Sequence, residues 1–189
     1  FVMTYSTLAA IVKYPFASSL AGKHGKFGFF CSEASTFEQI ADELGLIRLS
    51  VPGEPLRYVR HPLVYLMEAA DDICYEIMDI EDSHKLKILS FDETKNLLLS
   101  FFDNDTQEEI IRRLKEEGVT DENEQVVYLR ACVVGKLENE CVQTFVEHED
   151  EILNGTFKGT LIGNISEPQR LAYKHCSEVS FKRIYRSKP

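Results

Sequence analysis

The polar residues between positions 60 and 82 have the clearest potential for chemistry. Asp71, Tyr75 and Asp79 are spaced four residues apart, so in a helix they lie on one side, one turn after another. Aligned carboxylates repel each other unless they face water or a cation compensates them. The row is therefore either a solvated helix face or a ligand site, with Asp71 on a hard cation and Tyr75 and Asp79 on a polar substrate. Spacing alone does not decide between the two.

The residues around this row predict a helix over 61–82. Pro62 is tolerated in the first turn of a helix, where its missing N–H would have no intrahelical partner. Apolar residues then recur at helical spacing, which predicts a broad buried stripe. The predicted stripe consists of Leu63, Leu66, Met67, Ala70, Ile73, Cys74 and Ile77.

Helical signals also dominate the rest of the chain. The other expected helices cover residues 4–13, 32–44, 90–102, 105–118 and 121–149, a short segment ending near 155, and residues 167–176. Only Val179–Tyr185 indicates a strand, because apolar and polar side chains alternate there. The expected fold is mainly α, a single helical bundle with at most a short β element near the C-terminus.

Composition narrows the function classes. The 189 residues are 44% hydrophobic and 28% charged, as is ordinary for a soluble globular domain. A net charge of −10 argues against a protein that coats duplex nucleic acid, which needs clustered Lys and Arg. No run of eighteen apolar residues occurs, so no membrane span is expected.

The five cysteines are odd in number and form no CxxC pair. Most of them have apolar neighbours in the sequence, which favours buried thiols in a reducing cytoplasm over a disulfide framework or a zinc site. The expected location is therefore cytoplasmic.

Three segments occur in a distinctive order: residues 4–15, which end in Lys13-Tyr14-Pro15, residues 26–33, and Arg60-His61-Pro62-Leu63 followed by residues 67–75. Together they resemble the bacterial deoxyguanosinetriphosphate triphosphohydrolases (dGTPases), a branch of the HD superfamily. Looser similar runs follow at 129–131, 154–157 and 182–185, so the resemblance covers nearly the whole chain. It implies a helical bundle of the HD-domain superfamily.

The resemblance also implies residue roles. Asp71 matches the distant Asp that, with three upstream ligands, holds one divalent cation, expected to be Mg²⁺ or Mn²⁺. Asp72 is the rival for this role. Tyr75 and Asp79 match the side chains that contact deoxyribose.

Lys13, Tyr14 and Lys26 match the side chains assigned to the triphosphate, for which ammonium groups are suitable partners. Lys23 is expected to be an ordinary surface residue, and His61 to order the start of its helix.

The family's His-Asp dipeptide does not occur in this sequence. The remaining metal ligands and the acid–base His and Glu are therefore expected upstream of Phe1, and further triphosphate-binding groups downstream of Pro189. No catalytic residue is assigned within the chain. It is expected to comprise an active-site half, residues 1–83, and a helical C-terminal extension, residues 84–189, and to be inactive alone.

The implied activity is hydrolysis of dGTP, or another dNTP, to a deoxynucleoside and intact triphosphate by a homo-oligomer. Two alternatives remain. One is a non-catalytic relative that binds a dNTP as a regulator. The other is a helical interaction module whose acidic face binds a basic partner.

Overall fold

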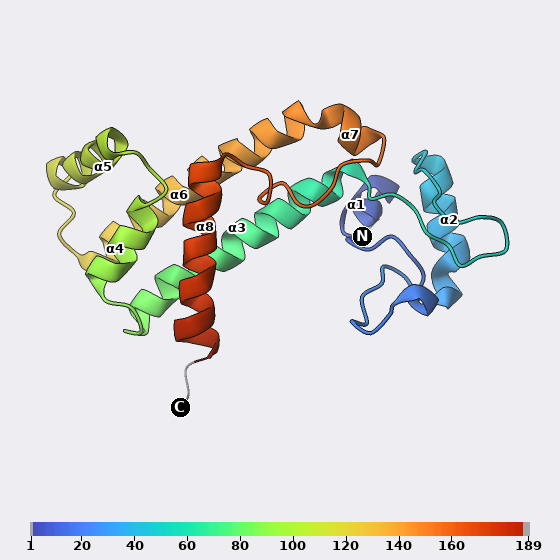
Figure 1. The fold of residues 1–189 in the computed structure, drawn as a ribbon, viewed down its shortest axis with the longest axis horizontal. Coiled ribbons are helices and arrows are strands. Elements are labelled where there is room, and N and C mark those ends of the chain that lie inside the picture. Colours follow the sequence, from blue (N-terminus) through green and yellow to red (C-terminus); the bar gives the residue numbers. More distant parts are fainter. Residues whose placement is uncertain (1, 187–189) are drawn as a thin grey trace. The chain divides into compact units, whose positions relative to one another are not determined.

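The computed structural model describes residues 2–186 (Figure 1). Within these residues the chain forms eight α-helices and no β-strand, which confirms the mainly α fold class. The helices are α1 (Tyr5–Ala10), α2 (Ala34–Glu43), α3 (Pro62–Lys85), α4 (Phe91–Leu99), α5 (Asn104–Glu116), α6 (Glu122–Glu147), α7 (Glu149–Leu153) and α8 (Glu167–Ser180). Short 3₁₀ turns occur at Ser18–Leu20 and Cys31–Glu33, and a π-helical turn, Phe181–Tyr185, follows α8.

The chain divides into two compact units. The first comprises the chain up to Glu68 and the segment Phe145–Thr160. The second comprises Ala69–Thr144 and the chain from Leu161 onward. Helices α3 and α6 each contribute residues to both units.

The first unit is built around aromatic side chains. The rings of Phe29 and Phe37 stack with centroids 4.3 Å apart, and Tyr58 packs against Phe37 at 5.7 Å. Isolated β-bridges join Phe16 to Arg57 and Ala17 to Phe29, which hold the irregular segments around this core. Contacts between aromatic rings therefore stabilise this loop-rich unit, in which the backbone forms isolated bridges rather than regular strands.

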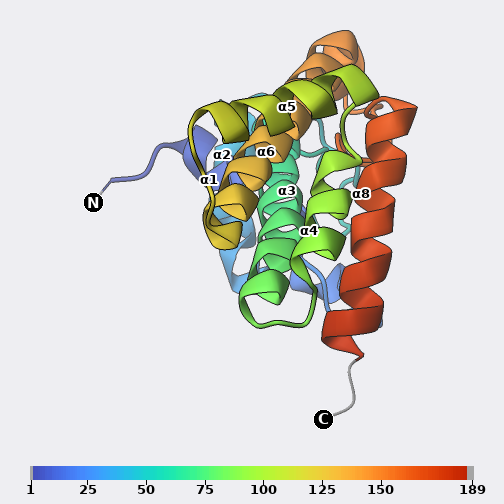
Figure 2. The ribbon, with the colours of Figure 1, turned by 90° about the vertical axis from the view of Figure 1, so that its left-hand side faces the viewer.

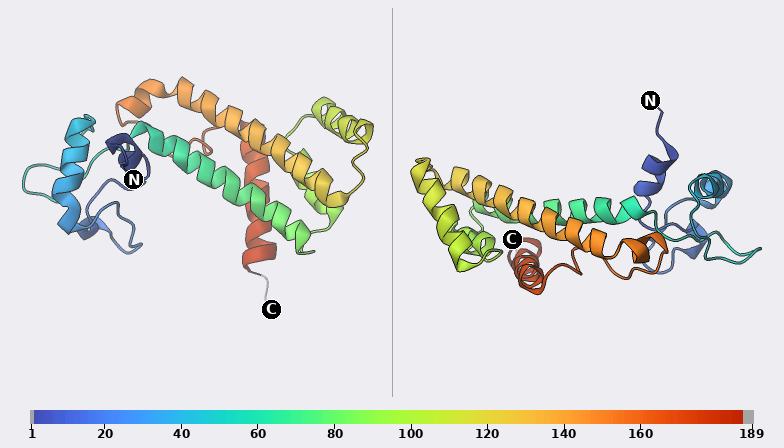
Figure 3. Two further views of the ribbon diagram at one scale, coloured as in Figure 1. Left: turned by 180° about the vertical axis from the view of Figure 1, so that it is seen from behind. Right: turned by 90° about the horizontal axis from the view of Figure 1, so that it is seen from above.

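The core of the second unit lies mainly between α3 and α6, which run antiparallel and side by side (Figures 1 and 3). Both helices contribute fully buried side chains, among them Ile77, Ile80, Leu129, Val133 and Leu137. Figure 2 shows α4 alongside α8. The packing of α3 against α6 fixes the orientation of α3 and therefore the position of its polar row.

The predicted limits of α3 are close to those observed, but the predicted buried stripe is largely wrong. Of its seven members only Ile73 and Ile77 are buried, whereas Leu63, Ala70 and Cys74 are exposed. The buried face instead includes Val64, Ala69 and Ile80, together with the carboxylates Glu68 and Glu81. The apolar pattern was misleading because these two acids are buried with basic partners.

The strand indicated at Val179–Tyr185 is also wrong. Helix α8 continues to Ser180, and the next five residues form the π-helical turn. Ser180 is 2% exposed, and its hydroxyl donates a 2.7 Å hydrogen bond to Glu76 of α3. This tertiary contact favours the helix over the alternating pattern.

The expectation of buried thiols holds for Cys141 and Cys176 but not for the exposed Cys31 and Cys74. Cys74 lies on the outward side of α3, and Cys31 lies in the 3₁₀ turn before α2. No helix between residues 2 and 186 combines the length and apolar character that a membrane span requires.

Candidate functional site

The polar row of α3 faces away from the core of the second unit. Asp71 is exposed, Tyr75 is 61% exposed, and Asp79 is half-buried. Within residues 2–186 the Asp71 carboxylate has no hydrogen bond or ion pair. Its negative charge is therefore uncompensated by the described part of the chain, and it is accessible to a ligand.

Tyr185 joins this row from the π-helical turn. Its hydroxyl oxygen lies 2.8 Å from that of Tyr75, and it also hydrogen-bonds to the carboxylate of Asp79. The two tyrosine rings are nearly parallel, with an interplanar angle of 4° and centroids 6.4 Å apart. The bond to Asp79 raises the pKa of Tyr185 well above its usual range, so its phenol stays protonated as a donor.

Sequence reasoning missed Tyr185 as a member of the site. The residue is 110 positions from Tyr75, and no local pattern pairs two residues at that distance. The one indication in the sequence was that Tyr185 lies in the segment 182–185, which is loosely similar to the family. The prediction gave this segment the extended backbone of a strand, whereas it forms a π-helical turn.

Helix α8 is fixed against α3 by a polar seam beside the row. Ser177 and Ser180 each donate a 2.7 Å hydrogen bond to Glu76, and the Tyr173 hydroxyl donates to the main-chain oxygen of Asp72 at 3.0 Å. Burial raises the pKa of Tyr173 above its usual range. Asp72 thus lies at the seam and is half-buried, whereas its rival Asp71 is exposed.

A divalent cation needs several ligands, and the described residues do not supply a full set. No cluster of three or more His, Cys, Asp or Glu side chains able to hold a metal occurs among residues 2–186. Asp71 has the chemistry of one such ligand, an accessible anionic oxygen. The described residues therefore fit one position of a metal site and not the whole of it.

The predicted triphosphate residues lie in the first unit, where Lys13 is engaged by a buried carboxylate. Its ammonium nitrogen lies 2.8 Å from Glu68, which is 3% exposed and also receives a 3.0 Å hydrogen bond from Arg60. The Arg60 Nε donates to the main-chain oxygen of Lys13 at 3.1 Å. An anion that binds Lys13 must therefore compete with Glu68.

The structure brings Tyr14 and Lys26 together. The Lys26 ammonium lies 5.3 Å from the centre of the Tyr14 ring, a cation–π contact at an exposed site. Lys23 is exposed in the same loop.

A cavity of about 380 Å³ opens beside these residues within the first unit. Its lining includes Lys13, Tyr14, Arg57, Arg60 and Tyr65. Among residues 2–186, Arg57 pairs with no carboxylate, so its charge adds to the positive character of the lining. Cationic groups interleaved with aromatic rings suit an anionic ligand that also has an apolar part.

Comparison with known proteins identifies relatives along nearly the entire sequence. A deoxyguanosinetriphosphate triphosphohydrolase-like protein of Pseudomonas aeruginosa is 33% identical over 191 residues, which cover 98% of this chain and 41% of that protein. A protein of the same name from Synechocystis is 37% identical, covering 85% of this chain and 36% of that protein. The deoxyguanosinetriphosphate triphosphohydrolase of Serratia proteamaculans is 27% identical, covering 97% and 38%.

The chain belongs to the dGTP triphosphohydrolase-like family. It spans about two fifths of the length of the curated relatives that it matches. No protein-family model matches the sequence.

In this dGTPase-like chain His61 orders the start of α3, as predicted. Its Nδ1 accepts a 3.2 Å hydrogen bond from the Leu63 N–H, one of the first amides of the helix, which lacks an intrahelical partner. Burial lowers the pKa of His61. The neutral imidazole that burial favours is the form whose nitrogen accepts this bond.

Gly28 offers a test of the Tyr14 loop. A Cβ at this position would overlap the main-chain oxygen of Tyr14 and would lie 2.5 Å from a methyl group of Val12. We expect Gly28→Ala to displace Tyr14 and to lower stability by about 1–3 kcal/mol, since backbone atoms cannot move as cheaply as a flexible side chain. The measurement is the melting temperature together with the affinity for inorganic tripolyphosphate.

Gly22→Ala is the matched control in the same loop. Its Cβ would meet nothing within 4 Å, so it carries only the cost of a left-handed backbone, with φ of +56°. Equal losses of tripolyphosphate affinity in both variants would show that Tyr14 is not positioned by the close approach of Gly28.

Proposed function

We propose that the polypeptide containing this chain is a metal-dependent dNTP triphosphohydrolase of the HD superfamily, with dGTP as its leading substrate. Water attacks the α-phosphorus, the bond from that phosphorus to the 5′ oxygen breaks, and deoxyguanosine and intact inorganic triphosphate are released. The observation that carries this proposal is the match, over nearly the entire chain, to proteins named dGTP triphosphohydrolase or triphosphohydrolase-like.

The sugar subsite of this proposal is the row on α3. Asp79 accepts a hydrogen bond from the 3′-hydroxyl of deoxyribose, and the Tyr75 ring occupies the space that a 2′-hydroxyl would need. The exposure of Tyr75 and the hydrogen bond that Asp79 accepts from Tyr185 support this assignment, because an oriented carboxylate has further lone pairs that can accept from a sugar hydroxyl at the same time.

Triphosphate binding is assigned to Lys13, Tyr14 and Lys26. The mixed basic and aromatic lining of the first-unit cavity supports this assignment. Binding of the highly charged ligand would draw the Lys13 ammonium away from Glu68, to which Arg60 remains paired.

Asp71 is assigned as one ligand of the divalent cation, Mg²⁺ or Mn²⁺, and the other ligands would come from outside the described residues. When bound, the cation would polarise the attacking water and the phosphate oxygens. Homo-oligomerisation is part of the same proposal and is measured by light scattering of the whole polypeptide.

A second candidate is a dNTP-binding relative without catalytic activity. Some relatives are named triphosphohydrolase-like rather than triphosphohydrolase, which supports this candidate. In this case a dNTP would raise the melting temperature, since a ligand that prefers the folded state stabilises it, without being consumed.

One experiment distinguishes the hydrolase from the non-catalytic dNTP-binding protein. The whole polypeptide is incubated with each of the four dNTPs and Mg²⁺ or Mn²⁺, and the products are resolved by ion exchange. Release of a deoxynucleoside and triphosphate supports the hydrolase. Thermal stabilisation without turnover supports the regulator, and the absence of both supports an interaction module.

Asp79→Ala tests the sugar subsite. Loss of a hydrogen bond to a charged acceptor costs about 1.5–3 kcal/mol, so we expect kcat/KM for the dNTP to fall by about 10–150-fold. Asp82→Ala is the control, because Asp82 is exposed near the end of the same helix and its one ion pair within the described part of the chain is with Lys85, at 3.6 Å. Equal activity of the two variants would contradict the assignment of Asp79.

A further inference from the structure

The π-helical turn Phe181–Tyr185 places Tyr185 against the row, and of its apolar side chains Ile184 alone is half-buried. None of its residues is buried, and Phe181 and Tyr185 are each about half exposed. The last firm contact of α8 is the hydrogen bond from Ser180 to Glu76. The turn therefore needs polar contacts beyond Ser180 to keep a single conformation.

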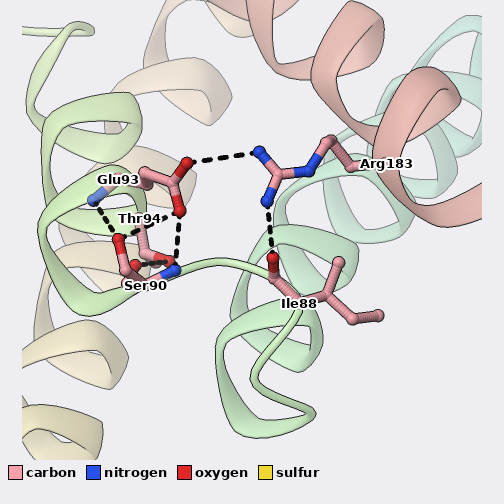
Figure 4. Close-up of polar contacts among 5 residues, drawn as sticks. All are labelled: Ile88, Ser90, Glu93, Thr94 and Arg183. Carbon is pink, nitrogen blue, oxygen red and sulfur yellow. Dashed lines mark hydrogen bonds and ion pairs between the residues drawn. The ribbon is translucent and has the colours of Figure 1, made fainter.

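Arg183 supplies these contacts (Figure 4). Its guanidinium donates to the main-chain oxygen of Ile88 at 2.8 Å and to the carboxylate of Glu93 at 3.2 Å. The first acceptor belongs to the loop between α3 and α4, and the second to the first turn of α4. One planar side chain thus reaches two separate elements, a geometry that the fork of Arg allows and the point charge of Lys does not.

Both acceptors are themselves held in place. Glu93 receives hydrogen bonds from the Ser90 amide, at 2.8 Å, and the Ser90 hydroxyl, at 3.0 Å. The first of these forms a capping box at the start of α4 together with the bond that the Glu93 amide donates to the Ser90 hydroxyl oxygen, at 3.3 Å. These bonds, led by the amide of Ser90, lower the pKa of Glu93, so the carboxylate is charged when it meets Arg183. Ile88 follows Lys87, whose left-handed backbone, with φ of +60°, closes the loop. Arg183 therefore binds two acceptors whose positions are already fixed, and the segment from Ile88 to Glu93 that carries them is called the α3–α4 corner.

We propose that Arg183 is a positioning residue for the sugar subsite. By fixing the π-helical turn to the α3–α4 corner, it holds Tyr185 two residues later in contact with Tyr75 and Asp79. This inference rests on the proposed function for its consequence, which is discrimination between deoxyribose and ribose. Its structural part, the fixing of the turn, stands on the contacts alone.

The structural part is tested by hydrogen–deuterium exchange of the whole polypeptide. We expect Arg183→Ala to speed amide exchange in the peptide that contains residues 181–186 by at least about tenfold, because the turn then opens locally more often. Lys182→Ala is the matched control: it removes the same charge from the adjacent residue, whose one ion pair among residues 2–186 is with Glu178 of α8, at 3.8 Å. Equal exchange in both variants overturns the proposal whatever the activity of the protein.

The functional part is tested by the ratio of kcat/KM for dGTP to that for GTP. We expect Arg183→Ala to lower this ratio by about tenfold, mainly through a higher KM for dGTP, with Arg183→Lys intermediate and Lys182→Ala unchanged. A ratio unchanged in Arg183→Ala but lowered in Tyr185→Phe overturns the positioning role while leaving the hydrolase intact. No turnover of any dNTP by the wild type contradicts the proposed function instead, and the exchange experiment then decides whether Arg183 holds the turn.

Discussion

Replacement of Asp71 by Ala is expected to reduce dNTP hydrolysis by about a thousandfold or more. A bound metal contributes several kcal/mol to stabilising the developing charge, and each 1.36 kcal/mol corresponds to a tenfold change in rate. The exposed Asp71 carboxylate makes no hydrogen bond or ion pair with the described residues, so its loss leaves no unpaired group behind. The variant should therefore fold normally, and its initial rate with saturating dGTP measures the chemistry.

Asp72→Ala is the matched comparison, because it removes the same charge one residue away from a half-buried position. We expect it to retain at least about a tenth of the wild-type rate. A greater loss in Asp72→Ala than in Asp71→Ala would transfer the role of metal ligand to Asp72.

The largest stability effect is expected for Glu68→Ala. This change leaves the ammonium of Lys13 and the guanidinium of Arg60 without their shared carboxylate. Breaking a buried ion pair costs about 3–5 kcal/mol, but both basic groups keep some access to water, so we expect a loss of about 2–4 kcal/mol. Differential scanning calorimetry should record this as a lower melting temperature.

Two variants show whether the loss comes from the buried charge. Glu38→Ala removes the carboxylate of an exposed pair with Arg48, at 3.0 Å, and should cost no more than about 1 kcal/mol. Glu68→Gln keeps the shape and a hydrogen-bond acceptor and should lie between the two. A loss in Glu68→Ala as small as that in Glu38→Ala would mean that the Glu68 pair is not a stabilising element of the first unit.

Local signals in the sequence were sufficient for α3 as an element. Pro62 at its start and the helical period predicted residues 61–82, close to the observed Pro62–Lys85. The orientation of the helix was not predictable in the same way. Glu68 and Glu81 are buried because Lys13, Arg60 and Arg130 pair with them, and most of these partners lie far away in the sequence. A prediction from hydrophobic periodicity places such acidic residues on the solvent-exposed face of the helix.

In the candidate site, too, local sequence signals predicted some residues, whereas the position of others depends on contacts between distant parts of the chain. Family resemblance predicted Asp71, Tyr75 and Asp79, which lie within one helix at a fixed spacing, and their roles in the site stay predictions. Tyr185 could not be found this way, because its place depends on α8 packing on α3 and on a π-helical turn. Alternation of side chains in Val179–Tyr185 favoured a strand, and the buried hydrogen bond from Ser180 to Glu76 reversed that preference.

Attack of water on the α-phosphorus is tested by hydrolysis of dGTP by the whole polypeptide in ¹⁸O-labelled water, with the products identified by mass spectrometry. We expect unlabelled deoxyguanosine and triphosphate carrying one ¹⁸O atom, because water attacks the α-phosphorus and the 5′ oxygen stays with the sugar. Deoxyguanosine monophosphate with pyrophosphate, or the release of single phosphate, would contradict the proposed reaction, because a bond between two phosphates would then have been cleaved.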